Sequence, residues 1–139
     1  MSSPQELPAW IALFLGLYSL AAAVGELRVP GSWMAMVEDL EASPGTRFLT
    51  GIVCVILGAT LYLVGGWDAA IKRGDWLAAG IALLGGIAAA EGLFILAAGD
   101  RFLALSRKMM ARHTSLWAGL SALAGGALVF LALSRLQFV

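Results

Sequence analysis

The sequence predicts an all-α integral membrane protein in which four transmembrane helices form two repeated two-helix hairpins in parallel orientation. Two observations predict this fold class. Of the 139 residues, 60% are hydrophobic and only 13% are charged, whereas a soluble domain carries about 25% charged residues. The apolar residues also gather in long runs, each close to the ~20 residues with which a helix crosses a bilayer. We therefore predict a single membrane domain over residues 1–139.

The predicted spans cover residues 7–26, 46–66, 76–98 and 115–133. The breaks between them carry helix-ending and helix-capping residues. VPGS at 29–32 ends the first span, and SPG at 43–45 precedes the second, for which Thr46 is the expected cap. A short charged turn at 67–75 joins the second span to the third, which Gly99 and Asp100 end.

The first span has two interpretations. Its apolar run and small residues resemble a cleavable signal peptide. However, no Lys or Arg precedes the run, and Glu6 has the wrong charge for the start of a signal peptide. We predict a retained first helix.

The two longer connections show helical periodicity. In WMAMVEDLE, residues 33–41, the apolar side chains of Trp33, Met36 and Leu40 share one face. RFLALSRKMMAR, residues 101–112, has the same pattern with Phe102 and Leu105. Each connection is interpreted as a short amphipathic helix in the membrane interface, and an ordinary loop is the alternative.

These features occur twice in the same order, which predicts repeat 1 at 7–66, the turn at 67–75 and repeat 2 at 76–134. Sliding the sequence by 68 residues superposes Gly51 on Gly119 and Gly58 on Gly126, whereas Glu26 meets Glu91 only after a three-residue slip. Because each repeat contains two spans, both copies enter the membrane in the same direction. Such repeats are related by an axis along the membrane normal.

The basic residues predict the orientation of the spans. Six of the nine Lys and Arg residues lie in or beside the connections at 26–46 and 100–114: Arg28, Arg47, Arg101, Arg107, Lys108 and Arg112. Positive residues are enriched in cytoplasmic loops. We therefore expect both connections in the cytoplasm and both termini outside it.

The run AEGLFILAAGDRFLALSRKMMARHTSLWAGLSALAGGALVFLAL, residues 90–133, carries a family resemblance. It resembles the YjeT-like family of small bacterial inner-membrane proteins, whose function is not established. Glu91 and Gly92 match the Glu-Gly pair of that family, and Pro30, Trp33 and Met36 supply its Pro/Trp-containing connection in the first half. The resemblance implies two fused hairpins in a bacterial inner membrane. In such a membrane, the termini that the basic residues place outside the cytoplasm would be periplasmic.

Two glutamates are the intramembrane polar candidates. Glu91 lies within the apolar run GIAAAEGLFILAAG, residues 86–99, and an ionisable residue inside a span is often functional. It is either a proton or cation site, or a hydrogen-bonded group that ties helices together through Thr50, Ser121 or an arginine. Glu26 lies nearer the interface, where solvation or pairing with an arginine would satisfy it.

Small residues recur at helical spacing and predict close helix packing. The helix-packing candidates are Gly51, Gly58, Gly85, Gly119, Gly125 and Gly126. The same pattern makes a homo-oligomer or a subunit of a membrane complex the expected assembly.

Two further groups suit the membrane interface. The five tryptophans, Trp10, Trp33, Trp67, Trp76 and Trp117, are interpreted as aromatic anchors rather than ligand-stacking residues. Arg107, Lys108 and Arg112 are candidates for binding anionic lipid headgroups. Positive-inside topology alone is the alternative explanation of these three charges.

The remaining composition excludes several classes of function. A net charge of zero excludes a basic surface for nucleic acid, and a single cysteine excludes an internal disulfide. No nucleophile–base pair, cofactor motif or metal-ligand spacing predicts an enzyme. The leading hypothesis is an accessory or scaffolding subunit that acts through helix packing. The alternatives are a small oligomeric transporter or channel that uses Glu91, and an anionic-lipid-binding protein.

Overall fold

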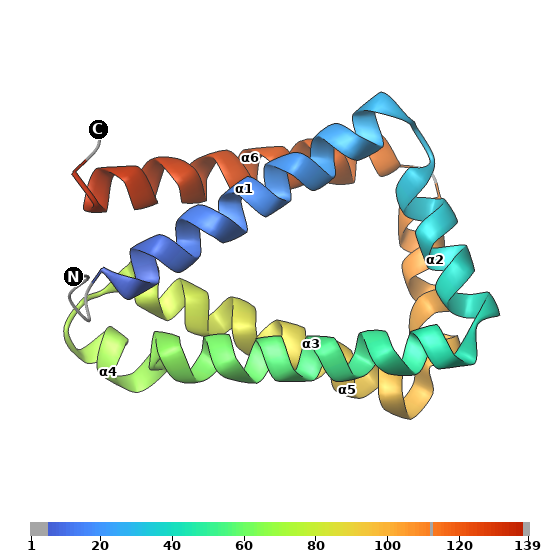
Figure 1. Cartoon of the computed structure of the whole chain (residues 1–139), viewed down its shortest axis with the longest axis horizontal. Helices are drawn as coiled ribbons and strands as arrows, with labels where there is room; N and C mark the ends of the chain where they lie inside the picture. The colour runs from blue at the N-terminus through green and yellow to red at the C-terminus, as the bar shows by residue number, and fades with distance from the viewer. Residues whose placement is uncertain (1–5, 112, 138–139) are drawn as a thin grey trace.

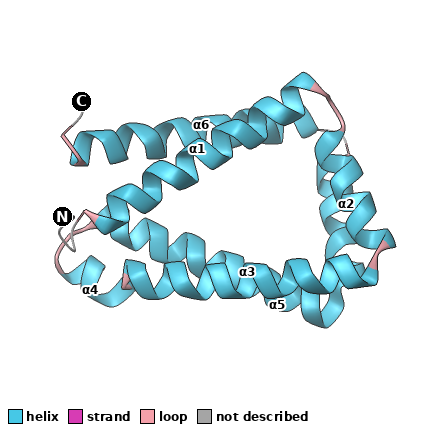
Figure 2. Ribbon diagram, in the orientation of Figure 1, coloured by secondary structure: helices cyan, strands magenta, loops and turns pink. Residues whose placement is uncertain are grey.

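The structure is a computed structural model of the chain and describes residues 6–111 and 113–137. All regular secondary structure in these residues is α-helical (Figures 1 and 2). The helices are α1 (Leu7–Arg28), α2 (Ser32–Ala42), α3 (Pro44–Gly65), α4 (Trp67–Lys72), α5 (Trp76–Met110) and α6 (Thr114–Arg135). The prediction of an all-α chain is confirmed for this part of the protein.

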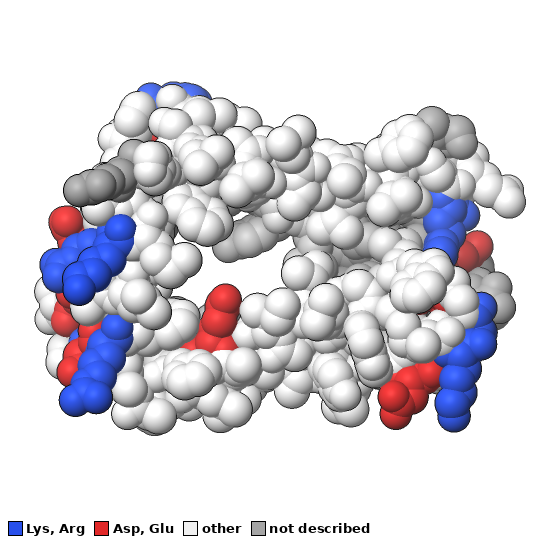
Figure 3. Space-filling model, turned by 180° about the vertical axis from the view of Figure 1, so that it is seen from behind, with Lys and Arg blue, Asp and Glu red and all other residues white. Residues whose placement is uncertain are grey.

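The helices include four segments long and apolar enough to cross a membrane. These segments are Leu7–Arg28, Pro44–Lys72, Trp76–Met110 and Thr114–Arg135. Charged side chains gather at the two ends of the molecule, and the band between the ends is almost free of them (Figure 3). The prediction of four long apolar helices is confirmed, and these candidate spans indicate a multi-pass membrane protein.

The spans pack as two antiparallel pairs, α1 with α6 and α3 with α5 (Figure 1). Each pair meets along buried small residues seven positions apart, which lets the two backbones approach closely. The α1–α6 pair uses Ala9, Gly16, Ala23, Ala118, Gly125 and Ala132, and the α3–α5 pair uses Gly51, Gly58, Gly65, Ala78, Gly85 and Gly92. The main packing partner of each span therefore lies outside its own predicted hairpin.

The two pairs meet at the end of the molecule where α1 begins and α6 ends. There Ala12, Ile81 and Ala132 form a buried cluster, against which Leu77 and Leu128 pack. At the opposite end, α2 and the last turns of α5 lie across the molecule between the pairs (Figure 1). The pairs diverge toward that end, and an opening separates them in the middle of the molecule (Figure 3).

The cap of α3 differs from the prediction. The helix begins at Pro44, and Ser43 rather than Thr46 is its N-cap. The Ser43 hydroxyl oxygen accepts the Thr46 N–H at 3.4 Å and donates to Thr46 Oγ1 at 2.9 Å. Proline suits the first helical position because it has no N–H to satisfy there. The expected Thr46 cap is therefore wrong by three residues.

The predicted end of the third span is a kink rather than a loop. Helix α5 continues from Trp76 to Met110 with one non-helical residue, Ala98, at φ −148° and ψ 51°. The first connection is a true break because it contains Pro30 and then Gly31, whose φ is +94°. The second connection has no proline, so the helix resumes at once. The predicted turn at 67–75 similarly contains a short helix, α4.

Candidate functional site

Glu26 lies buried where α1 turns into α2. Its two carboxylate oxygens accept the backbone N–H groups of Gly31 at 2.9 Å and Trp33 at 2.8 Å. The Trp33 indole donates to the Ala22 carbonyl at 3.2 Å, and the Thr114 side chain also hydrogen-bonds Glu26. The first N–H groups of a helix have no acceptor within that helix. Glu26 therefore caps α2 from the preceding span, in place of the expected arginine or solvent.

Glu91 lies in the middle of α5 and is exposed within the chain. It follows Leu77 and Leu84 at intervals of seven residues, or two helical turns, so these three side chains share one face. Leu77 packs on the cluster between the helix pairs, and Leu84 lines a hollow with Leu128 and Leu131 of α6. Farther along α5, where Glu91 lies, the same face therefore borders the opening between the helix pairs.

The partners expected for Glu91 are engaged elsewhere. Thr50 donates its hydroxyl to the Thr46 carbonyl of its own helix at 2.8 Å, and Ser121 donates to the Ser19 carbonyl of α1 at 3.2 Å. Within residues 6–111 and 113–137, no hydrogen bond or ion pair joins any side chain to the Glu91 carboxylate. Cys54 of α3 is close enough to interact with it electrostatically.

The predicted packing glycines fall into two groups. A Cβ on Gly51, Gly58, Gly85 or Gly125 would lie within 3.0 Å of an atom on the neighbouring helix. These four therefore lie at the contacts inside the two pairs. Gly119 and Gly126 have no atom within 4 Å of such a position, so they do not lie at a close helix contact within the described part of the chain. Gly16 and Gly92, which complete two of the close contacts, were not among the predicted residues.

The basic connection is partly paired. Arg107 Nη1 lies 3.6 Å from Glu41 Oε2, which joins the end of α5 to α2. Lys108 is exposed. Arg112, the third lipid-headgroup candidate, lies outside the described residues. The Arg107–Glu41 pair gives Arg107 a role inside the chain besides the proposed lipid contact.

An ion pair at the other end of the molecule was not predicted from the sequence. Asp75 caps α5 by accepting the Ala78 N–H at 3.1 Å, and Arg135 Nη1 lies 2.6 Å from its Oδ1. Burial raises the pKa of Asp75, but the hydrogen bond and charge of Arg135, with the Ala78 N–H and the charge of Arg73, outweigh it and hold that pKa below its usual value. Aspartate before an apolar helix is a capping signal, but its pairing with the distant Arg135 has no sequence signal.

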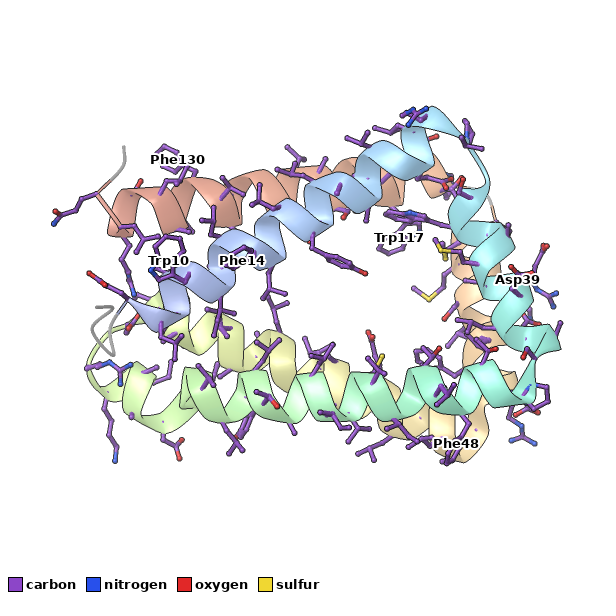
Figure 4. The ribbon with its side chains drawn as sticks, viewed as in Figure 1. Trp10, Phe14, Asp39, Phe48, Trp117 and Phe130 are labelled. Carbon is purple, nitrogen blue, oxygen red and sulfur yellow. The ribbon has the colours of Figure 1, made fainter. Side chains whose placement is uncertain are left out.

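A hollow of about 250 Å³ lies where α2, α5 and α6 meet, and Trp33, Ser106, Met109, Met110 and Trp117 line it. Both tryptophans have their indole N–H groups occupied. Trp33 donates to Ala22, and Trp117 donates to the Met109 carbonyl at 3.1 Å. Trp117 points from α6 into the space between the helix pairs (Figure 4). The predicted anchors Trp33 and Trp117 thus also form an aromatic wall.

The described residues contain no group of three His, Cys, Asp or Glu side chains able to hold a metal ion. No protein-family model matches the chain, and neither a curated protein nor a solved structure matches it. The resemblance to the YjeT-like family stays a prediction.

Proposed function

We propose that this chain is an accessory or scaffolding subunit of a bacterial inner-membrane assembly, and that it binds its partner or a second copy through α6. The observation that carries the proposal is the open glycine face of α6. Gly119 and Gly126 are two turns apart and have free space above them, on the side of α6 away from the gap between the pairs. Small residues at such spacing allow close approach of another transmembrane helix.

The duplication predicted from the sequence would explain why Gly119 and Gly126 are free of contacts within the described residues. The small buried residues of α1, Ala9, Gly16 and Ala23, recur 69 positions later in α5 as Ala78, Gly85 and Gly92. Those of α3, Gly51, Gly58 and Gly65, recur 67 positions later in α6 as Ala118, Gly125 and Ala132. In this register the α1–α6 contact is equivalent to the α5–α3 contact. Gly119 and Gly126 lie one residue beyond the equivalent buried positions, so they are not needed inside the chain.

The proposed orientation places α2 and the end of α5 in the cytoplasm. The start of α1 and the end of α6 lie together at the opposite end (Figure 1), which would then face the periplasm. Asp39 points outward from α2 (Figure 4), and Asp68 is exposed on α4. In a Cys54→Ser background, a membrane-impermeant maleimide should label Asp68→Cys in intact cells and Asp39→Cys only after permeabilisation. The reverse pattern would invert the topology.

The scaffolding proposal is tested by placing large side chains at Gly119 and Gly126 of α6. Gly126→Leu and Gly119→Leu should disrupt association of the protein with itself or its partner while leaving the melting temperature nearly unchanged. Ala127→Leu is the matched control because Ala127 is exposed on a neighbouring face of α6. Association is measured by light scattering in detergent and by co-purification. A wild-type protein that is monomeric and copurifies with nothing contradicts the proposal.

A further inference from the structure

The Glu91 carboxylate lies beside the opening between the helix pairs, in the apolar middle of the molecule. Charged side chains gather at the two ends of the molecule, and an acidic side chain lies beside the opening in the middle (Figure 3). The position of Glu91 on the face of Leu77 and Leu84 directs its carboxylate toward this opening. None of the described residues hydrogen-bonds or pairs with that carboxylate, so none of them is its counter-ion.

Aromatic side chains face the opening from the other pair. Tyr18 follows Ile11 by two turns on α1, and Ile11 packs on the cluster between the pairs. The shared face directs Tyr18, which is 72% exposed, into the opening. Trp117 enters it from α6 (Figure 4). Trp117 also lines the hollow where α2, α5 and α6 meet, together with Trp33 and Met109.

The side chains around the opening, a carboxylate and aromatic rings, suit one class of ligand. A carboxylate ionised in an apolar environment is unfavourable unless a cation neutralises it. The faces of Trp and Tyr rings attract cations, and their apolar surface attracts hydrophobic groups. A metal ion would need several oxygen or nitrogen ligands, and the described residues contain no such group.

We propose that the opening binds a hydrophobic organic monocation, with Glu91 as its counter-ion and Tyr18 and Trp117 as its aromatic contacts. This role goes beyond scaffolding. It uses the face of α6 that carries Trp117, not the face of Gly119 and Gly126. Failure of one proposal therefore leaves the other standing.

The direct test is equilibrium binding of radiolabelled tetraphenylphosphonium to the full-length protein in a neutral detergent. The wild type should bind it saturably, and Glu91→Gln should bind at least tenfold more weakly at an unchanged melting temperature. Triphenylphosphine oxide, which has similar rings and no charge, should compete poorly. Non-saturable binding, or binding that is equal in wild type and Glu91→Gln, overturns the proposal.

A second measurement does not depend on the folding of Glu91→Gln. A hydrophobic carbodiimide should modify the Glu91 carboxyl in the wild type, as read by peptide mass spectrometry, and tetraphenylphosphonium should slow that modification. Tyr18→Leu should weaken both the protection and the binding about threefold or more. Leu63→Ala, an exposed change on α3 with no part in the opening, is the control. Equal modification with and without the cation refutes the site.

Discussion

Arg135 Nη1 lies 2.6 Å from Asp75 Oδ1, and this ion pair joins the last turn of α6 to the N-cap of α5. The two residues are 60 positions apart and belong to different helix pairs. The Ala12, Ile81 and Ala132 cluster lies at the same end. The Asp75–Arg135 ion pair and this cluster hold the two helix pairs together at the end where they meet. The helix pairs diverge toward the opposite end.

The contribution of the Asp75–Arg135 ion pair to stability should depend on pH. The pKa of Asp75 is lower in the folded protein than its usual value. Its contribution to stability is therefore fully present above the unfolded-state pKa and is lost as pH falls through the folded-state pKa. We expect the melting temperature of the wild type in detergent to decline below about pH 4.

Asp75→Asn isolates this contribution. The variant should melt below the wild type at pH 7, and the difference should shrink as the pH is lowered toward 3. Arg135→Gln should give the same convergence. A constant difference between wild type and Asp75→Asn across this range would show that the carboxylate charge is not involved.

The α3–α5 contact should be intolerant of a single methyl group. A Cβ on Gly58 would lie 2.3 Å from the Ala89 nitrogen and 2.5 Å from the Gly85 oxygen, both backbone atoms of the facing helix. Because backbone cannot move aside as a flexible side chain can, Gly58→Ala should cost about 1–3 kcal/mol of unfolding free energy. Unfolding in mixed micelles with increasing SDS measures the loss.

Gly80→Ala is the matched control for that variant. Gly80 lies in the interior of α5 and has no atom within 4 Å of an added Cβ. Alanine is a better helix former than glycine by about 1 kcal/mol, so Gly80→Ala should be neutral or slightly stabilising. Destabilisation of the two variants by the same amount would argue against close α3–α5 packing.

The four spans could be predicted from the sequence because the hydrophobic runs are long and the connections carry strong breaking signals. Pro30 and Gly31 mark a break that the structure confirms. The kink at Ala98 could not be predicted, since alanine has no preference for such a backbone and the neighbouring Gly99 and Asp100 signal an end instead. Local residue preferences do not predict that α5 continues as a helix after the kink at Ala98.

The pairing of the spans was harder to predict than their existence. Identity matching at 68 residues superposed Gly119 and Gly126 on Gly51 and Gly58, whereas the equivalent buried positions of α6 are Ala118 and Gly125, of which only Gly125 was a predicted packing residue. Some of the buried contact positions hold alanine and others hold glycine, so residue identity is a poor guide to register here. The roles of Asp75 and Arg135 were also hidden, because their contact arises only from the folded arrangement.

Gly31 should resist replacement for a conformational reason. Its φ of +94° lies in the left-handed region, although no atom lies within 4 Å of an added Cβ. An alanine there would therefore be strained without any steric clash, at a cost of about 1 kcal/mol. Gly25→Ala, in the last turns of α1 with equally free space, should be neutral or stabilising. Thermal melts of the two variants in one detergent measure the difference, and equal melts would contradict the strain.

Glu26 should fix α2 to α1 through its carboxylate rather than through its bulk. Glu26→Gln keeps one acceptor oxygen but turns an NH₂ group toward the N–H of Gly31 or Trp33, so one of the two capping bonds is lost. Hydrogen bonds to a charged group contribute about 1.5–3 kcal/mol each, and we expect the amides of α2 to exchange with solvent markedly faster. Hydrogen–deuterium exchange followed by mass spectrometry measures this for residues 32–42 against α6 as an internal reference. Glu38→Gln, an exposed change on α2 itself, is the control. If α2 exchanges equally slowly in Glu26→Gln and wild type, then contacts between α2 and α5 hold it in place, and Glu26 is not its anchor.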